Sequence, residues 1–181
     1  MRIGDLLYFA PGISFDEIDL GGPELPSQFR RRITGFYLDP AEACANLGHV
    51  FAAGVLLVSS IDALARIRFG DGVGARFKRF AREELQSFQD DGLSERFYDE
   101  FRNGLVHEAR LKNGAQFSLE TGATVAQLDG LLLINPTYLA REVRTALDSY
   151  VALLEQDAGE LGKLAATLTQ DLADDFRIAR E

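Results

Sequence analysis

Apolar residues recur every three or four positions over most of the chain, which is the spacing of amphipathic helices. After a short strand and a loop in the first 24 residues, this spacing predicts helices at 26–37, 40–67, 73–88, 93–107, 136–154 and 159–178. The segment 40–67 is apolar nearly all round, and a helix of that kind is normally surrounded by others. The pattern therefore predicts a mainly all-α bundle in which 40–67 is the central rod.

One stretch of the chain departs from helical spacing. Asp129-Gly130 separates two short apolar runs, Val125–Leu128 and Leu131–Ile134, and Asp-Gly between such runs is typical of a β-hairpin. We therefore expect a small β-hairpin insertion at about residues 112–135. It would interrupt a single domain, residues 1–181, with a helical core at about 26–155 and an extra C-terminal helix at about 159–178.

Composition and charge limit the classes of function. The chain has 181 residues, of which 46% are hydrophobic and 26% charged, as expected for one globular domain with a real core. Its net charge of −9 disfavours binding of a polyanion by the molecule as a whole, so nucleic acid would require a local basic patch.

Two basic stretches could form such a patch. The larger one has only Asp71 as an acidic interruption and consists of Arg66, Arg68, Arg76, Lys78, Arg79 and Arg82. The smaller one is Arg30-Arg31-Arg32. The alternative for the larger stretch is an ordinary solvated helix face that Glu83 and Glu84 balance.

Other features bear on compartment and metal binding. A single cysteine, Cys44, excludes an intramolecular disulfide and a cysteine-rich zinc site. Residues 1–5 lack the charged and apolar regions of a signal peptide. Residues 43–61 carry no formal charge but are polar for a membrane span of minimal length. His49 has no second His or Cys at ligand spacing, which favours a hydrogen-bonded core histidine. We expect a cytoplasmic protein with no membrane span, metal or cofactor.

The helix at 93–107 carries the candidate chemistry. At about 100° per residue, Phe97, Phe101, Gly104 and Leu105 share one side of this helix. The residues that project away from that side are Arg102, Asn103, Val106 and His107. Val106 is apolar where solvent would favour a polar residue, so we expect a second surface, such as another subunit, to cover this face.

The segment Arg102-Asn103-Gly104-Leu105-Val106-His107 resembles the Arg-polar-x-x-x-His motif of the HEPN superfamily. These are small helical bundles, many of which are metal-independent ribonucleases. The helix order over residues 26–155 is also similar, with a long apolar helix upstream of the motif helix and a closing helix after it. The β-insertion and the last helix lie outside the family's minimal pattern.

The resemblance implies a function and a site. In HEPN ribonucleases the motifs of two subunits face each other across a dimer interface and form one cleft. It implies here a homodimeric, metal-independent endoribonuclease, such as a toxin or defence effector. His107 would act as general acid or base near neutral pH. Arg102 would bind the phosphate and stabilise its developing charge. Asn103 would orient His107 or bond the phosphate.

Structural alternatives exist for each of these residues. His107 could cap the end of its helix, and Arg102 could pair with Glu95 or Asp99 on its own helix surface. Asn103 could be an ordinary exposed amide. Asp62 could pair with Arg102 or orient His107, or it could simply face solvent. The alternative function is a non-catalytic HEPN-like module that dimerises or binds a partner such as an antitoxin. A nucleotide or small-molecule sensor is a third possibility.

Overall fold

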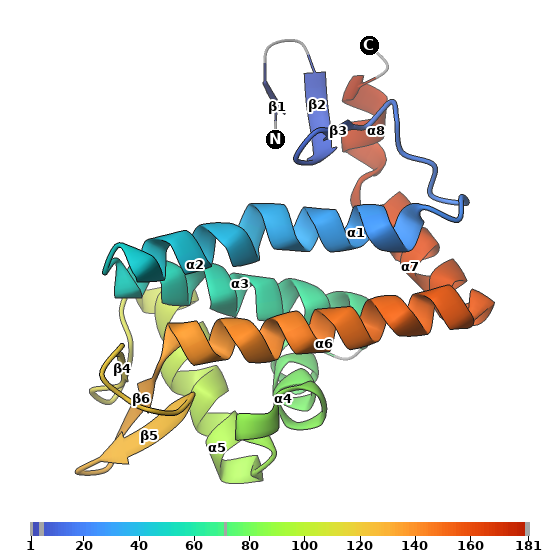
Figure 1. Cartoon of the computed structure of the whole chain (residues 1–181). Coiled ribbons are helices and arrows are strands. Elements are labelled where there is room, and N and C mark those ends of the chain that lie inside the picture. The colour runs from blue at the N-terminus through green and yellow to red at the C-terminus, as the bar shows by residue number, and fades with distance from the viewer. Residues whose placement is uncertain (1, 4–5, 71, 180–181) are drawn as a thin grey trace. The chain divides into compact units, whose positions relative to one another are not determined.

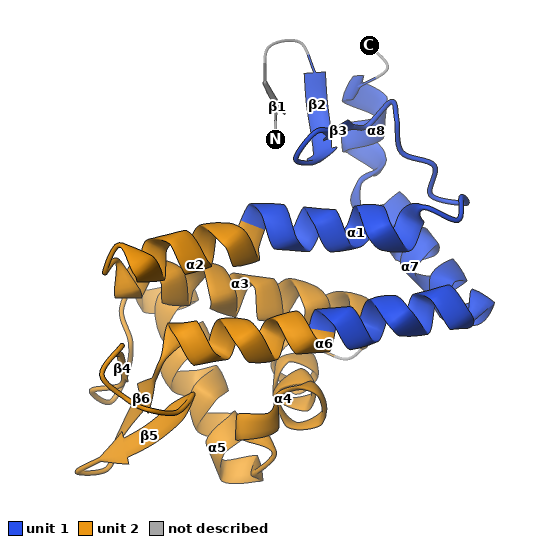
Figure 2. Ribbon diagram, viewed as in Figure 1, with its two compact units in different colours: residues 1–36, 147–181 blue, residues 37–146 orange. Residues whose placement is uncertain are grey.

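The computed structural model describes residues 2–3, 6–70 and 72–179 of a mainly helical chain that also carries two small sheets (Figure 1). Most of the segment 1–5 that bears on a signal peptide, and the acidic Asp71, lie outside the described residues. The chain divides into two compact units, residues 1–36 with 147–181 and residues 37–146 (Figure 2). The motif segment belongs to the second unit.

The first unit combines an antiparallel sheet with helices from both ends of the chain. Its elements are β1 (Arg2–Ile3), β2 (Leu6–Ala10), β3 (Ile13–Ser14), α1 (Leu25–Ile33), the second half of α6 (Pro136–Gln156), α7 (Ala158–Asp171) and α8 (Ala173–Ala179). The ring of Phe15 packs edge-on against Phe176 of α8, with 4.9 Å between the ring centroids. This contact joins the sheet to α8. The single helix predicted at 159–178 is instead two helices, α7 and α8, because the chain breaks at Leu172.

The second unit holds the remaining elements. A π-helical turn, η1 (Thr34–Leu38), leads into it from α1. It contains α2 (Asp39–Asn46), α3 (Val50–Arg68), α4 (Val73–Glu84), a short 3-10 helix η2 (Gln86–Phe88), α5 (Asp91–Arg96), a π-helix η3 (Phe97–Glu108), the strands β4 (Gln116–Phe117), β5 (Val125–Leu128) and β6 (Leu131–Ile134), and the first half of α6.

The prediction of one continuous rod at 40–67 is wrong. The chain breaks at Gly48, whose φ of +77° places it in the left-handed region that glycine adopts without strain. Helices α2 and α3 on either side of the break lie side by side in Figure 1. His49 is exposed at the start of α3, so its interpretation as a core histidine is also wrong.

Helix α3 is long and apolar enough to cross a membrane by length and composition alone. A core helix meets the same criterion, and one face of α3 is buried by residues such as Leu57, Ile61 and Leu64. The opposite face exposes Phe51 and Ser59. The helix is therefore only partly enclosed by the second unit.

The β-hairpin prediction is confirmed. Strands β5 and β6 pair antiparallel from Val125–Ile134 to Leu128–Leu131. The turn residues Asp129 and Gly130 have φ of 50° and 80°, as a tight primed turn requires. Strand β4 also lies within the predicted insertion at 112–135. It pairs parallel with β6, which the hairpin pattern did not predict, and gives the sheet the order β4-β6-β5.

A chain of aromatic rings forms the core around the motif helix. Phe97 stacks on Phe88 with centroids 4.3 Å apart, and Phe101 packs against both Phe97 and Phe117 at 5.7 and 5.0 Å. Each such pair contributes about 0.5–1.5 kcal/mol beyond the buried area. Phe117 lies so close to α3 that a Cβ added at Gly54 would be 2.2 Å from the Phe117 ring. The absence of a side chain at Gly54 thus makes room for the ring that joins β4, α3 and η3.

We predict that Gly54→Ala lowers the free energy of unfolding by about 1–3 kcal/mol, because the added methyl overpacks against a ring held between neighbours. Chemical denaturation measures this change. Gly162 in α7 is the matched control, since a Cβ there meets nothing within 4 Å. Gly162→Ala should be neutral or stabilise by up to about 1 kcal/mol. Equal effects of the two substitutions would contradict the role assigned to Gly54.

Candidate functional site

The motif segment lies in a π-helix rather than the α-helix that its pattern predicts. Helix η3 runs from Phe97 to Glu108. The predicted buried side holds in part, since Phe97, Phe101 and Gly104 are buried and Leu105 is half-buried. Arg102, which was predicted to project away from this side, is only 12% exposed. A π-helical hydrogen bond joins residues five apart, so Arg102 and His107 lie about one turn apart along η3. In an α-helix at about 100° per residue they would be about 140° apart.

The chain turns back sharply after the motif. Ala109 adopts a left-handed conformation and its backbone N–H donates to the Gly104 carbonyl. A Cβ at Gly104 would be 2.4 Å from the carbonyl oxygen of Arg110, so the returning backbone requires glycine there. The Lys112 N–H then donates to the Glu100 carbonyl at 2.9 Å. This turn leaves His107 at the exposed end of the helix.

Arg102 is held by Asp62. Their Nη2 and Oδ2 atoms are 3.0 Å apart, and the two side chains are 12% and 27% exposed. Asp62 comes from α3, so the pair joins that helix to η3. The pairing of Arg102 with Asp62, left open by the sequence, is therefore found.

The alternative partners of Arg102 on its own helix are engaged elsewhere. Glu95 accepts from Lys78 and Asp99 accepts from Lys112. The hydrogen bond that Lys112 donates to Asp99 raises the pKa of the lysine. Asn103 Oδ1 lies 3.5 Å from Arg102 Nη1, at the outer limit of a hydrogen bond. Asp62 is thus the main partner of the motif arginine.

His107 and Val106 face outward. Val106 is 58% exposed and His107 is also exposed. Within residues 2–3, 6–70 and 72–179, no hydrogen bond or ion pair involves the His107 side chain. The structure thus brings Asp62, Arg102 and Asn103 together and leaves the imidazole available to a ligand or another subunit.

A small cavity of about 210 Å³ lies between α3 and η3 beside the ion pair. Its lining comprises Val55, Val58, Ser59, Asp62, Arg102, Leu105 and Val106. Two buried atoms, Asp62 Oδ1 and Arg102 Nε, have no hydrogen-bond partner among the described residues. A buried N–H without an acceptor is costly, so this guanidinium has one donor that an oxygen-bearing ligand can satisfy.

The larger basic stretch is balanced by nearby carboxylates. Ion pairs within this stretch include Arg68–Glu84 at 3.4 Å, Lys78–Glu95 at 2.8 Å, Arg79–Glu83 at 2.9 Å and Arg82–Asp91 at 2.7 Å. Arg66 is exposed and Arg76 is half-buried. In the smaller stretch, Arg30 pairs with Asp148 at 2.8 Å. The carboxylates of α5 that take part, Glu95 and Asp91, were not identified from the charge pattern.

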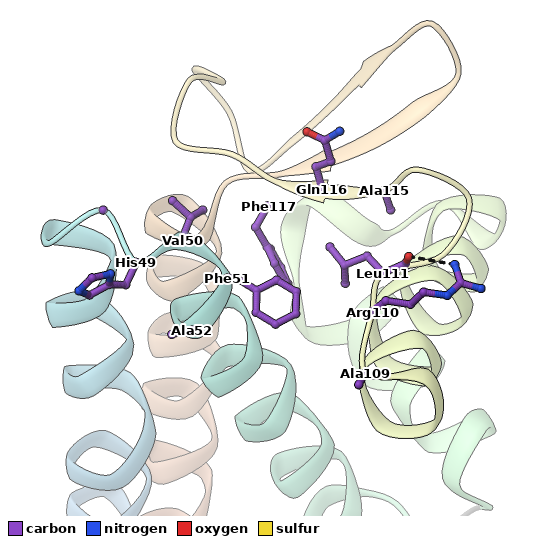
Figure 3. Close-up of a pocket in the computed structure, with 11 residues that line it drawn as sticks. His49, Val50, Phe51, Ala52, Ala109, Arg110, Leu111, Ala115, Gln116 and Phe117 are labelled. Atoms are coloured by element: carbon purple, nitrogen blue, oxygen red, sulfur yellow. Dashed lines mark hydrogen bonds between the residues drawn. The ribbon is translucent and has the colours of Figure 1, made fainter.

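A larger pocket of about 840 Å³ was missed by the sequence reasoning. Phe51, Phe117 and Leu111 lie together at its centre, and Arg110 lies to one side of them (Figure 3). Phe51 and Phe117 are 66 positions apart in the sequence, and only the pairing of β4 with β6 brings them together. The one feature of the sequence that pointed to this pocket was the apolar residue Phe51, which the structure exposes at the start of α3.

The described residues contain no group of three or more His, Cys, Asp or Glu side chains placed to hold a metal ion. Comparisons of the chain with protein-family models, with curated proteins and with solved structures give no match.

We predict that the Asp62–Arg102 pair is strongly coupled. Asp62→Leu or Arg102→Met alone should lower the free energy of unfolding by about 1.5–3 kcal/mol, because each leaves a poorly solvated charge without its partner. The double variant should recover part of this loss. A double-mutant cycle by denaturant unfolding measures the coupling. The exposed Arg82–Asp91 pair is the control, with an expected coupling below about 1 kcal/mol. Additive effects at Asp62 and Arg102 would refute the coupling.

Proposed function

We propose that this chain is a HEPN-like helical bundle that acts as a metal-independent endoribonuclease, with an Arg102/His107 half-site from each of two copies. The observation that carries the proposal is the π-helical form of the motif segment, in which Arg102 and His107 lie about one turn apart on η3. A general acid–base group close to a phosphate-binding cation is what cleavage of an RNA phosphodiester requires.

The proposed chemistry needs no metal. The imidazole of His107 from one copy takes the proton of a ribose 2′-hydroxyl, whose oxygen attacks the adjacent phosphorus. The bond from phosphorus to the 5′-oxygen breaks, and His107 of the second copy gives that oxygen a proton. Arg102 stabilises the negative charge on the phosphate oxygens. Asn103, which lies next to the guanidinium, contributes a further contact to the phosphate. The products are a 2′,3′-cyclic phosphate and a 5′-hydroxyl.

A second copy of the chain is part of this proposal. Val106 is an apolar residue with more than half of its surface exposed, next to the half-buried Leu105. Apolar surface of this kind beside a functional face favours association with another subunit. In the proposed dimer this face meets its own copy and the two His107 side chains share a cleft.

A second candidate function is supported by the burial of Arg102 and by its ion pair with Asp62. This side chain is only 12% exposed, and Asp62 offsets its charge. An arginine in that position can serve mainly to join α3 to η3, which favours a non-catalytic HEPN-like module that dimerises or binds a partner protein such as an antitoxin. In that case His107 is a surface residue of the interface rather than an acid or base.

We predict that the wild-type chain cleaves single-stranded RNA in the presence of a metal chelator. His107→Ala should lower the rate by about 10²–10⁴-fold, the usual contribution of a general acid–base group. Arg102→Ala should lower it by about 10²–10³-fold, because charge on the transferring phosphate is then unbalanced. Gel analysis of labelled RNA and detection of the cyclic phosphate end measure the reaction.

Arg177→Ala is the control for this assay, since Arg177 is an exposed residue of α8 in the first unit. It should cleave at the wild-type rate, and circular dichroism verifies that every variant is folded. Equal cleavage by wild type and His107→Ala would reject the catalytic assignment. Absence of cleavage by the folded wild type, together with a stable complex with a partner protein, would favour the non-catalytic module.

We also predict that the wild-type chain is a dimer and that Val106→Asp weakens it. A charge at the centre of an apolar interface should raise the dissociation constant by about tenfold or more. Sedimentation over a range of protein concentrations measures this change. Leu128→Asp is the control, because Leu128 is 60% exposed but belongs to the β-hairpin. A monomeric wild type, or equal dissociation constants for both variants, would contradict the proposed interface.

A further inference from the structure

The 840 Å³ pocket lies next to η3, which carries the motif, and next to α3, which carries Asp62. On the η3 side its lining starts at Ala109, two residues after His107. On α3 it includes Phe51 and Ala52, and the small cavity beside Arg102 starts one turn further along, at Val55. If a polymer is bound at His107, its next residue along the polymer chain would therefore be within reach of this pocket.

Two aromatic rings dominate the pocket. Phe51 is 50% exposed, and its ring packs edge-on against Phe117 with centroids 6.3 Å apart and planes at 76°. Figure 3 shows both rings at the centre of the pocket, with Leu111 beside them. A half-exposed phenylalanine is unfavourable in water, but its ring is a good stacking surface for a flat heterocycle.

One polar side chain of the pocket fits a nucleotide phosphate. Gln116 is exposed, but its amide points away from the two rings, on the other side of β4 from Phe117 (Figure 3). Arg110 is mostly exposed and pairs with Glu108 at 2.5 Å. An exposed ion pair of this kind is weak, so a phosphate can replace the carboxylate on the guanidinium. His49 lies on the opposite side from Arg110 and points away from the two rings (Figure 3).

A purely apolar ligand would use the rings and leave Arg110 without a role. A flat base with a phosphate uses the stacking surface and the guanidinium together. We propose that this pocket is a subsite for an unstacked base of single-stranded RNA, adjacent to the scissile phosphate. The proposal rests on the proposed ribonuclease function, and it adds that the base stacks on Phe51.

The test uses the His107→Ala chain, so that the RNA stays intact during binding. The probe is a single-stranded RNA tetranucleotide that contains 2-aminopurine, whose fluorescence is quenched when the base stacks. Saturable quenching is expected. Phe51→Leu should raise the dissociation constant by about tenfold or more, since the side chain stays apolar but the stacking surface is lost. Phe51→Tyr, which keeps a ring, should bind within about twofold of the parent.

Leu47→Ala is the control, because Leu47 is 73% exposed near the start of α3 but does not line the pocket. It should leave the dissociation constant unchanged. Gln116→Ala is a second control, because this amide points away from the rings, and it should also leave the dissociation constant unchanged. Thermal unfolding verifies that each variant keeps its fold.

The outcomes separate the two proposals. Equal binding by Phe51→Leu and Leu47→Ala overturns the base subsite, even if the wild type cleaves RNA. A change in molecular mass with Phe51→Leu, without any change in RNA binding, also overturns it and indicates that a second copy occupies the pocket. Binding that depends on Phe51, in a protein whose wild type does not cleave RNA, supports the subsite and rejects the ribonuclease function.

Discussion

The contact between the Phe117 ring and the backbone of Gly54 sets the spacing on which the candidate site depends. A ring that would meet a Cβ at 2.2 Å lies directly on α3, and the same ring packs against Phe101 of the motif helix. Because both contacts are made by one rigid side chain, α3 and η3 have little freedom to move apart. Asp62 and Arg102, one on each helix, are thereby held at ion-pair distance.

The electrostatics of the site follow from this spacing. Asp62 partly cancels the charge of Arg102, but one guanidinium N–H is buried without an acceptor. The residue is therefore both fixed in place and incompletely satisfied, which is the state expected of a group that still has a ligand to meet. Arg110 can also accept a ligand, because its ion pair with Glu108 is exposed and another anion can replace that carboxylate.

The π-helix η3 has a buried side and an exposed end. Phe97, Phe101 and Gly104 seat the helix in the core, while Val106 and His107 near its end are exposed. A π-helix is less favourable than an α-helix, and long examples are rare, so tertiary contacts must stabilise this one. The aromatic packing and the tight return of the chain over Gly104 supply those contacts.

The sequence by itself determined the helical class, the hairpin at Asp129-Gly130 and the buried side of the motif helix, because each depends on local periodicity or local backbone geometry. It suggested Asp62 as one possible partner of Arg102 but gave no means to choose between Asp62 and Glu95. Helix spacing is set by packing between segments distant in sequence, and local pattern carries no information about it. Tertiary structure alone decided the break at Gly48, the π-helical form of η3, and the meeting of Phe51 with Phe117. Glycine permits the break, but which of these outcomes occurs depends on packing between segments distant in sequence, which outweighs the local preference for a continuous α-helix.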